Sequence, residues 1–489
     1  FAMQRISGYM ERDLQSAVWD KLLSLPVNFF RHYSSGELAQ RAMGISQIRQ
    51  ALSGPVVNTL MSGFFSFFYV VMLFLKGGSL AWLGLGIYAF SMAFTLWLGF
   101  SQIKYQRRIL DINNDLSGKM FGWLGGLSKI KMTGAEKRIF NNWAELFGHS
   151  RNLTFKSRTI GNHITVYNSI LMLLTSILVY YAMFAMNHPL AIGSFIAFNA
   201  ALQLLLASGL QVSATMLQMN EIIPTYQRVK PILEAIPEYD DAKTDPGEIS
   251  GDIEVSHIHF RYIHDGPLIL NDVSLHIESG EHVALVGPSG SGKSTLFRIL
   301  LGFEKPESGE IFFDSVNLDQ LDIRLVRRQL GVVLQSGQLF AGSIFENIAG
   351  ANISITQKDV MEAIKQAGME EDLNLMPMGI HTVISEGSGA ISGGQRQRLL
   401  IARAIAGNPK ILFFDEATSA LDNKTQKIVS NSINNLKATR ITIAHRLSTV
   451  QDCDRIIVLE NGRITEMGTY HELMNQNGTF AGMAKRQIA

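Results

Sequence analysis

The chain has 489 residues, enough for two or three domains, yet only 17% of them are charged and the mean hydropathy is positive. A formal net charge of +1 argues against broad nucleic-acid binding, which depends on neutralising phosphates. The single cysteine, Cys453, excludes an intrachain disulfide, and we interpret it as a buried small apolar residue. These features predict a protein that lies partly in a membrane and binds no nucleic acid.

Two long stretches almost without charge predict four membrane spans. Between residues 55 and 102 the only charge is Lys76, which precedes two glycines, and between 159 and 220 there is no Asp, Glu, Lys or Arg. The turn signal Asn187-His188-Pro189 divides the second stretch. Each segment is then long enough to cross a bilayer as a helix, which favours spans over buried helices of a globular core. The predicted spans are 55–75, 80–102, 162–186 and 190–219.

The segment between the two pairs of spans predicts their orientation. Residues 104–158 hold eleven Lys and Arg against four Asp and Glu, so the positive-inside bias places this segment in the cytoplasm. Residues 1–54 and everything after Asn220 then lie on the same side. The chain begins without a methionine or a signal peptide, and we interpret its first residue as a cut.

The residue pattern changes from long apolar stretches to short alternating β-rich and helical runs after the last predicted span. Residues 1–235 form the predicted membrane domain, and the acidic stretch 236–250, which contains Pro and Gly, is a predicted linker. From 251 to 489, short β-rich runs alternate with helical stretches. This alternation predicts an α/β domain with a largely parallel sheet.

A phosphate-binding loop follows the strand-like run 282–286 and precedes a predicted helix. The loop matches G-x-x-x-x-G-K-[ST], in which backbone N–H groups and the helix N-terminus surround phosphate oxygens. Lys293 is expected to reach the β- and γ-phosphates, and the Ser294 hydroxyl to bind Mg²⁺. The predicted nucleotide-binding residues of the loop are Gly287, Pro288, Ser289, Gly290, Ser291, Gly292, Lys293, Ser294 and Thr295.

Two carboxylates end the apolar run 411–414. Asp415 is placed to hold Mg²⁺, and Glu416 is the candidate catalytic group that polarises an attacking water. A strand that ends in acids is a weak signal alone. It becomes specific when a phosphate loop precedes it in the same domain.

A second glycine-rich turn precedes the helical pattern that starts at Arg396. Ser392, Gly393, Gly394 and Gln395 would expose helix N-terminal N–H groups to an anion. The plain alternative is that Ser392 only caps the helix.

Together these motifs resemble the ATP-binding cassette (ABC) family, whose signature Leu-Ser-Gly-Gly-Gln is close to residues 391–395. Further matches follow: Tyr262 to the aromatic that stacks on adenine, Gln335 to the glutamine that links Mg²⁺ and water, and His445 to the switch histidine at the γ-phosphate. Ser419-Ala-Leu-Asp422 matches the loop that crosses the dimer interface. The resemblance implies a P-loop ATPase cassette with a helical subdomain, with ATP and Mg²⁺ as cofactors. It also implies a head-to-tail dimer in which each ATP lies between the phosphate loop of one chain and the Ser392–Gln395 turn of the other.

Membrane spans fused ahead of the cassette indicate the exporter arrangement. Residues 22–37 and 121–131 look like the two intracellular coupling segments of these exporters, short helices that carry cassette motion to the membrane. That family has six spans per chain, and four are present here. The implied partners are a second half-transporter, as homodimer or heterodimer, and the lipid bilayer.

Residues 17–30 and 41–53 are similar to bacterial exporters of bacteriocin-like peptides with nitrile-hydratase-like leaders. The resemblance implies ATP-driven export of a peptide across the bacterial cytoplasmic membrane. A lipid or drug exporter of the same architecture, or a regulatory ABC protein that does not transport, are the alternatives. Asn58, Asn168, Asn199 and Gln203 lie within spans, where they either line a substrate cavity or bond neighbouring helices.

Overall fold

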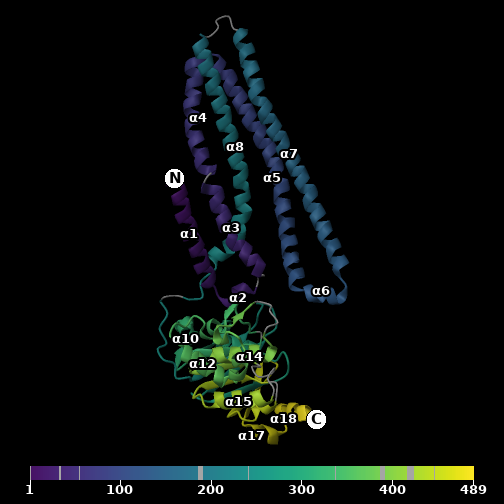
Figure 1. Cartoon of the computed structure of the whole chain (residues 1–489), viewed down its shortest axis with the longest axis vertical. Helices are drawn as coiled ribbons and strands as arrows, with labels where there is room; N and C mark the ends of the chain where they lie inside the picture. Colours follow the sequence, from purple (N-terminus) through teal and green to yellow (C-terminus); the bar gives the residue numbers. More distant parts are fainter. Residues whose placement is uncertain are drawn as a thin grey trace. The chain divides into compact units, whose positions relative to one another are not determined.

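The computed structural model describes residues 2–31, 33, 35–53, 55–185, 191–239, 242–335, 337–385, 391–415, 423–444 and 447–488. The chain divides into two compact units, Phe1–Pro237 and Glu238–Ala489. Each unit is described by itself below (Figure 1).

The first unit is helical. Four of its described helices are long and apolar enough to cross a membrane, and α4, α5, α7 and α8 carry these segments. Their bounds are Pro55–Gly77, Leu80–Gly125, Glu136–Phe184 and Ile192–Glu234. The shorter helices are α1 (Ala2–Leu23), α2 (Val27–Phe30), α3 (Ser35–Ser53) and α6 (Leu127–Thr133).

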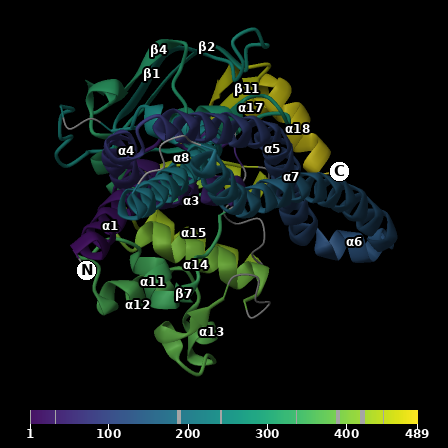
Figure 2. The same cartoon turned by 90° about the horizontal axis from the view of Figure 1, so that it is seen from above.

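The helices α5 and α7 are much longer than the spans predicted at 80–102 and 162–186. Both continue without a break into charged sequence, because the segment between 102 and 162 keeps good helix formers and has no proline. They lie side by side, and α6 joins them at one end in both views (Figure 2). The predicted turn at Asn187–Pro189 lies outside the described residues.

The helix α8 is the centre of the first unit, since it packs against α3, α4 and α5. Its fully buried Phe198 and Leu202 approach glycines of the neighbouring helices, and a Cβ on Gly77 would lie 2.3 Å from the Phe198 ring. Hydroxyl pairs join α4 to α8, with Ser66 2.5 Å from Ser208 and Thr59 2.6 Å from Thr215. Close approach at small residues and paired hydroxyls are how helices associate where no hydrophobic effect drives them together.

The second unit is an α/β domain. Within the described residues a six-stranded sheet has the order β12-β11-β3-β10-β9-β6, and every pair is parallel except β11 with β12. A four-stranded antiparallel sheet has the order β2-β1-β4-β5, and β7 pairs with β8. The strands are β1 (Ile253–Phe260), β2 (Leu270–Ile277), β3 (His282–Val286), β4 (Ser308–Phe313), β5 (Val316–Asn317), β6 (Leu330–Val333), β7 (Gly342–Ser343), β8 (Val383–Ile384), β9 (Ile411–Asp415), β10 (Thr439–Ile443), β11 (Arg455–Glu460) and β12 (Arg463–Gly468).

Helices cover these sheets and form two large buried clusters. One cluster lies between the two sheets around Phe297 and Phe413, whose rings meet edge to face at 5.1 Å. The other joins β6 and β9 to helices α11 to α14, which form a helical subdomain. The helices are α9 (Lys293–Leu300), α10 (Ile323–Arg328), α11 (Ile344–Ala349), α12 (Gln357–Gln366), α13 (Glu370–Asn374), α14 (Gly393–Ile405), α15 (Asn423–Asn434), α16 (Leu447–Val450), α17 (Tyr470–Gln476) and α18 (Thr479–Ile488).

The predicted fold class, a helical membrane domain followed by an α/β P-loop cassette, is confirmed.

We expect Gly77→Ala to destabilise the membrane unit, because the added methyl would overlap the fully buried Phe198 ring. Overpacking of this kind costs about 1–3 kcal/mol. The matched control is Gly63→Ala in the same helix, where a Cβ would meet nothing within 4 Å. Thermal unfolding in detergent should show a lower midpoint for Gly77→Ala and an equal or higher one for Gly63→Ala. Equal midpoints for the two variants would show that α4 and α8 do not pack as described.

Candidate functional site

The loop between β3 and α9 has a backbone that only glycine adopts readily. Gly287, Gly290 and Gly292 have φ values of 149°, 81° and 106°. At Gly287 a Cβ would lie 2.0 Å from the carbonyl oxygen of Leu459, at the end of β11, so a side chain there would push the loop off the sheet. The glycines therefore allow the chain to turn tightly from β3 into the N-terminus of α9.

Lys293 lies at the centre of this loop. Its side chain is buried, and its Nζ donates hydrogen bonds of 2.8 Å to the carbonyl oxygens of Gly287 and Pro288. Ser294 is exposed beside it. The positive charge of Lys293 is thus held within the glycine-rich turn at the N-terminus of α9, an arrangement suited to polyphosphate.

Tyr262 approaches the same loop from the end of β1. Its hydroxyl lies 3.1 Å from the hydroxyl of the buried Thr295, and its ring meets Phe260 edge to face at 4.8 Å. The ring remains 42% exposed. An anchored but accessible aromatic face is available for stacking on a planar base.

Parallel strands bring the other described candidates to the same edge of the sheet. β10 pairs with both β3 and β9, and Ile443 is in register with Leu285 on one side and Asp415 on the other. Gln335 follows β6, which pairs with β9, by two residues and is exposed. The carboxyl ends of β3, β9 and β6 therefore carry the phosphate loop, Asp415 and Gln335 along one edge.

Three candidates lie outside the described residues: Glu416, Asp422 and His445. In sequence, Glu416 follows β9 directly and His445 comes two residues after β10.

The residues suit Mg²⁺ and a nucleotide. The Ser294 hydroxyl, the Asp415 carboxylate and the Gln335 amide oxygen are hard oxygen donors, as Mg²⁺ prefers, and they are few enough to leave room for water and phosphate ligands. Among the described residues no group of three His, Cys, Asp or Glu side chains could hold a metal ion by itself.

The turn at Ser392 begins helix α14, and the expected N-cap is present. The Ser392 Oγ accepts a hydrogen bond of 3.2 Å from the Gln395 N–H, and the Ser392 N–H donates one of 2.9 Å to Gln395 Oε1. Ser392 and Gly393 are exposed. The hydrogen bonds described for this turn stay within α14 or reach α13, and none of them reaches the phosphate loop.

Asp372 of α13 is a residue that the sequence analysis missed. Its carboxylate accepts hydrogen bonds of 2.8 Å from Gln395 Nε2 and 2.7 Å from an Arg398 Nη. It therefore holds the first turn of α14 in place through both oxygens. No motif marks it, because it lies twenty-three residues from Gln395 in sequence.

Arg403 is a second residue without a sequence signal. Its guanidinium donates to the Asn347 side-chain oxygen at 2.8 Å and to the Gln338 carbonyl oxygen at 3.3 Å, and it lies 5.3 Å from the centre of the Phe340 ring. It thereby ties the segment after Gln335 to α11 and α14.

The interpretation of Cys453 as a buried residue is confirmed, since it is 7% exposed. Its Sγ lies 3.4 Å from His282 Nε2. Burial raises the pKa of the thiol to about 12 and lowers the pKa of His282 to about 4, so both groups are neutral near pH 7. A thiol that stays protonated is a poor nucleophile and a poor metal ligand.

Asn58, Asn168, Asn199 and Gln203 are expected either to line a substrate cavity or to bond neighbouring helices, and the structure shows a different environment for each. Gln203 bonds a neighbouring helix, since its Nε2 donates to the Met172 carbonyl oxygen at 3.3 Å and lies 3.0 Å from Ser176 Oγ. Asn168 lines a cavity, Asn58 is exposed, and the buried Oδ1 of Asn199 has no hydrogen-bond partner among the described residues.

Two family models match the chain. Residues 1–208 match the ABC transporter transmembrane region, and residues 270–419 match the ABC transporter family. The second match includes the phosphate loop, Gln335, the Ser392 turn and Asp415.

Curated relatives match along the whole chain. The leukotoxin translocation ATP-binding protein LktB of Bibersteinia trehalosi is 34% identical over 498 aligned residues, which cover 100% of this chain and 70% of that protein. The toxin RTX-I translocation ATP-binding protein of Actinobacillus pleuropneumoniae is 33% identical, covering 96% of this chain and 67% of that protein.

A solved structure of a bacterial Atm1-family ABC exporter with ATP bound superimposes with a TM-score of 0.86 at 25% identity, over 99% of this chain and 86% of that one. ABC half-transporters act as dimers. The membrane helices, the phosphate loop and these matches together identify the chain as a member of the ABC transporter family: an exporter half-transporter whose membrane domain and ATPase domain are fused, and which exports its substrate at the expense of ATP.

Proposed function

We propose that this exporter moves a polypeptide across the bacterial cytoplasmic membrane, with its ATPase domain on the cytoplasmic side. The observation that carries the proposal is the combination, on one chain, of uncharged membrane helices with an ATPase domain whose phosphate loop, Asp415 and Gln335 share one sheet edge. The basic segment between the spans supports the orientation.

The phosphate loop Gly287–Thr295 holds the β- and γ-phosphates of ATP in this proposal. Lys293 exchanges its hydrogen bonds to the loop carbonyl oxygens for stronger ones to phosphate oxygens. Tyr262 stacks on the adenine through its exposed ring face.

Hydrolysis uses residues at the carboxyl edge of the sheet. Ser294, Gln335 and Asp415 hold Mg²⁺, which supplies charge compensation for the phosphate oxygens. Glu416 polarises the attacking water, and His445 contacts the γ-phosphate. Both roles rest on the family resemblance and on sequence position, since Glu416 follows β9 directly and His445 comes two residues after β10.

The Ser392–Gln395 turn binds the nucleotide of a second chain. The exposed N-cap Ser392 and the exposed first residue of α14, Gly393, place the N-terminus of this helix where the phosphate of a second chain's nucleotide can approach. Asp422 belongs to the loop that crosses between the chains. The partner is a second half-transporter, either a second copy of this chain or a related one.

The polypeptide substrate is supported by the relatives, whose names describe toxin translocation, and by residues 17–30 and 41–53, which resemble exporters of bacteriocin-like peptides. Within this class we propose a bacteriocin-like peptide. The apolar spans predicted at 55–75, 80–102, 162–186 and 190–219 carry no Asp or Glu, which disfavours a proton-coupled pathway. A lipid or drug substrate is the second candidate, and a purely regulatory role is disfavoured by the complete set of ATPase motifs.

Helix α2 is the proposed first coupling element. Phe29 anchors it, since this residue packs on the cluster of Val18, Leu22, Leu25 and Ile232. Phe30, the next residue, is 36% exposed. An exposed aromatic beside a partly buried one on a short helix is suited to insertion into an apolar cleft of another domain.

We expect Glu416→Gln to lower ATP turnover by about a hundredfold or more, because it removes the group that polarises water but keeps its size. ATP affinity should remain. Lys293→Ala should instead weaken ATP binding by about tenfold or more, since it removes a charge-assisted contact. The control is Glu310→Gln, which removes an exposed carboxylate from β4 of the four-stranded sheet, a different sheet from the one that carries the phosphate loop. Equilibrium nucleotide binding and phosphate release distinguish the two effects, and normal turnover in Glu416→Gln would remove Glu416 from the mechanism.

We expect Phe30→Asp to abolish export and substrate-stimulated ATPase activity while basal ATPase activity remains, because a charge resists burial in an apolar cleft. Phe30→Leu is the matched control and should retain export. The measurement is ATP-dependent uptake of a leader-bearing bacteriocin-like peptide into inside-out proteoliposomes of the full-length exporter.

Fluorescent lipids and a cationic dye are tested in the same vesicles. Uptake of these molecules with no peptide uptake would contradict the polypeptide substrate. Unchanged stimulation in Phe30→Asp would instead contradict the coupling role of α2 and leave the substrate class standing.

A further inference from the structure

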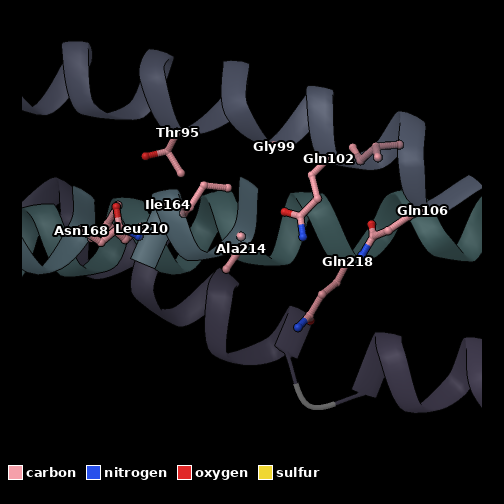
Figure 3. Close-up of a pocket in the computed structure, with 11 residues that line it drawn as sticks. Thr95, Gly99, Gln102, Gln106, Ile164, Asn168, Leu210, Ala214 and Gln218 are labelled. Atoms are coloured by element: carbon pink, nitrogen blue, oxygen red, sulfur yellow. The ribbon is translucent and has the colours of Figure 1, made fainter. Parts of the chain in front are cut away.

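A cavity of about 260 Å³ lies among α5, α7 and α8 within the first unit. Its walls carry the hydroxyl of Thr95 and four carboxamides, those of Gln102, Gln106, Asn168 and Gln218. Figure 3 shows Thr95 and Asn168 towards one end of the cavity and Gln106 and Gln218 towards the other. Among the described residues that line it, none is Asp, Glu, Lys or Arg.

These polar groups have no structural task in the described part of the chain. Thr95 is 3% exposed, and its Oγ1 and the Asn168 Oδ1 are buried without a hydrogen-bond partner. None of the described hydrogen bonds involves the side chains of Gln102, Gln106 or Gln218. Gln203, on the same helix as Gln218, shows the contrast, because its amide is hydrogen-bonded to α7.

Unpaired polar groups at this depth are costly. A buried donor or acceptor without a partner costs about 1–3 kcal/mol, and an apolar side chain of similar size would pack better against lipid or protein. Polar residues in membrane segments face the interior or a water-filled pathway. Two such buried groups, Thr95 Oγ1 and Asn168 Oδ1, face one cavity, and this indicates that a ligand or water satisfies them. The partly buried Gln102 and Gln106 and the exposed Gln218 extend the polar lining from there.

The chemistry of the lining resembles that of a peptide backbone. Each carboxamide both donates and accepts, as each peptide unit does, and carries no net charge. Gln102 and Gln106 are four residues apart on α5, a rise of about 6 Å. An extended polypeptide repeats every second residue at about 6.6–6.8 Å, so successive peptide groups on one side of it come within reach of successive glutamines.

We propose that this cavity binds an extended segment of the exported polypeptide through its backbone N–H and C=O groups, with little regard to its side chains. The inference rests on the proposed polypeptide substrate and assigns the residues that recognise it. Recognition through the backbone allows one exporter to pass a long chain of varied sequence.

The test uses the full-length exporter in lipid nanodiscs and two labelled probes of matched length: an uncharged Gly-Ser peptide and its ester analogue, in which alternate backbone N–H groups are replaced by oxygen. The peptide should bind, and the ester should bind about tenfold or more weakly, because it lacks half of the donors. Gln102→Leu and Gln106→Leu should each weaken peptide binding by about fivefold and lower the preference over the ester. Gln203→Leu is the control and should leave peptide affinity unchanged.

Thermal unfolding shows whether the variants remain folded. Gln102→Leu and Gln106→Leu should unfold at about the same temperature as the wild type, because neither glutamine side chain makes a hydrogen bond in the described part of the chain that the change would remove. Equal affinity for peptide and ester, unchanged affinity in both variants, or no binding of the peptide would each overturn the inference. Peptide export that continues in any of these cases leaves the proposed function intact, whereas a wild-type exporter that moves only lipid or dye overturns the function itself.

Discussion

The parallel alignment of β3, β10, β9 and β6 is the constraint on which the ATPase domain depends. It brings strand ends that are far apart in sequence to one edge, where the phosphate loop, Asp415 and Gln335 meet. Gly287 approaches the carbonyl oxygen of Leu459 closely, which packs the phosphate loop against β11. The buried Lys293 places a positive charge within this loop. Displacement of any one strand would separate the residues that we propose to act on the same phosphates.

The membrane spans are held together differently, because they have almost no charged side chains with which to position groups. The helices of the membrane domain associate through glycines beneath Phe198 and Leu202 and through hydroxyl pairs such as Ser66 with Ser208. Within such a domain an unpaired polar side chain stands out. Thr95 and Asn168 in the cavity of α5, α7 and α8 are such exceptions, and we propose that this cavity binds the peptide groups of the substrate.

Much of this architecture could be predicted from the sequence, because charge-free stretches of fixed length and glycine motifs beside strands are local signals. The continuation of α5 to Gly125 could not, since polarity marks the end of a span and not the end of a helix. Asp372, which holds Gln395, and Thr295, which meets Tyr262, depend on contacts between distant segments. The cavity could not be predicted from the sequence either, although Asn168 was identified as a polar residue within a span. Gln102, Gln106 and Gln218 can be assigned to its lining only when the rotations of α5, α7 and α8 about their axes are known.

The central claim is that each nucleotide lies between two chains, and a cysteine cross-link tests it most directly. One chain carries Ser289→Cys in the phosphate loop, and the other carries Gly393→Cys at the start of α14, where a Cβ meets nothing within 4 Å. The native Cys453 does not interfere, because burial raises the pKa of its thiol to about 12. The account predicts a cross-linked dimer that forms when ATP or a non-hydrolysable analogue is present and is weak without it. A cross-link that forms equally without nucleotide, or none with it, would contradict a site shared between chains.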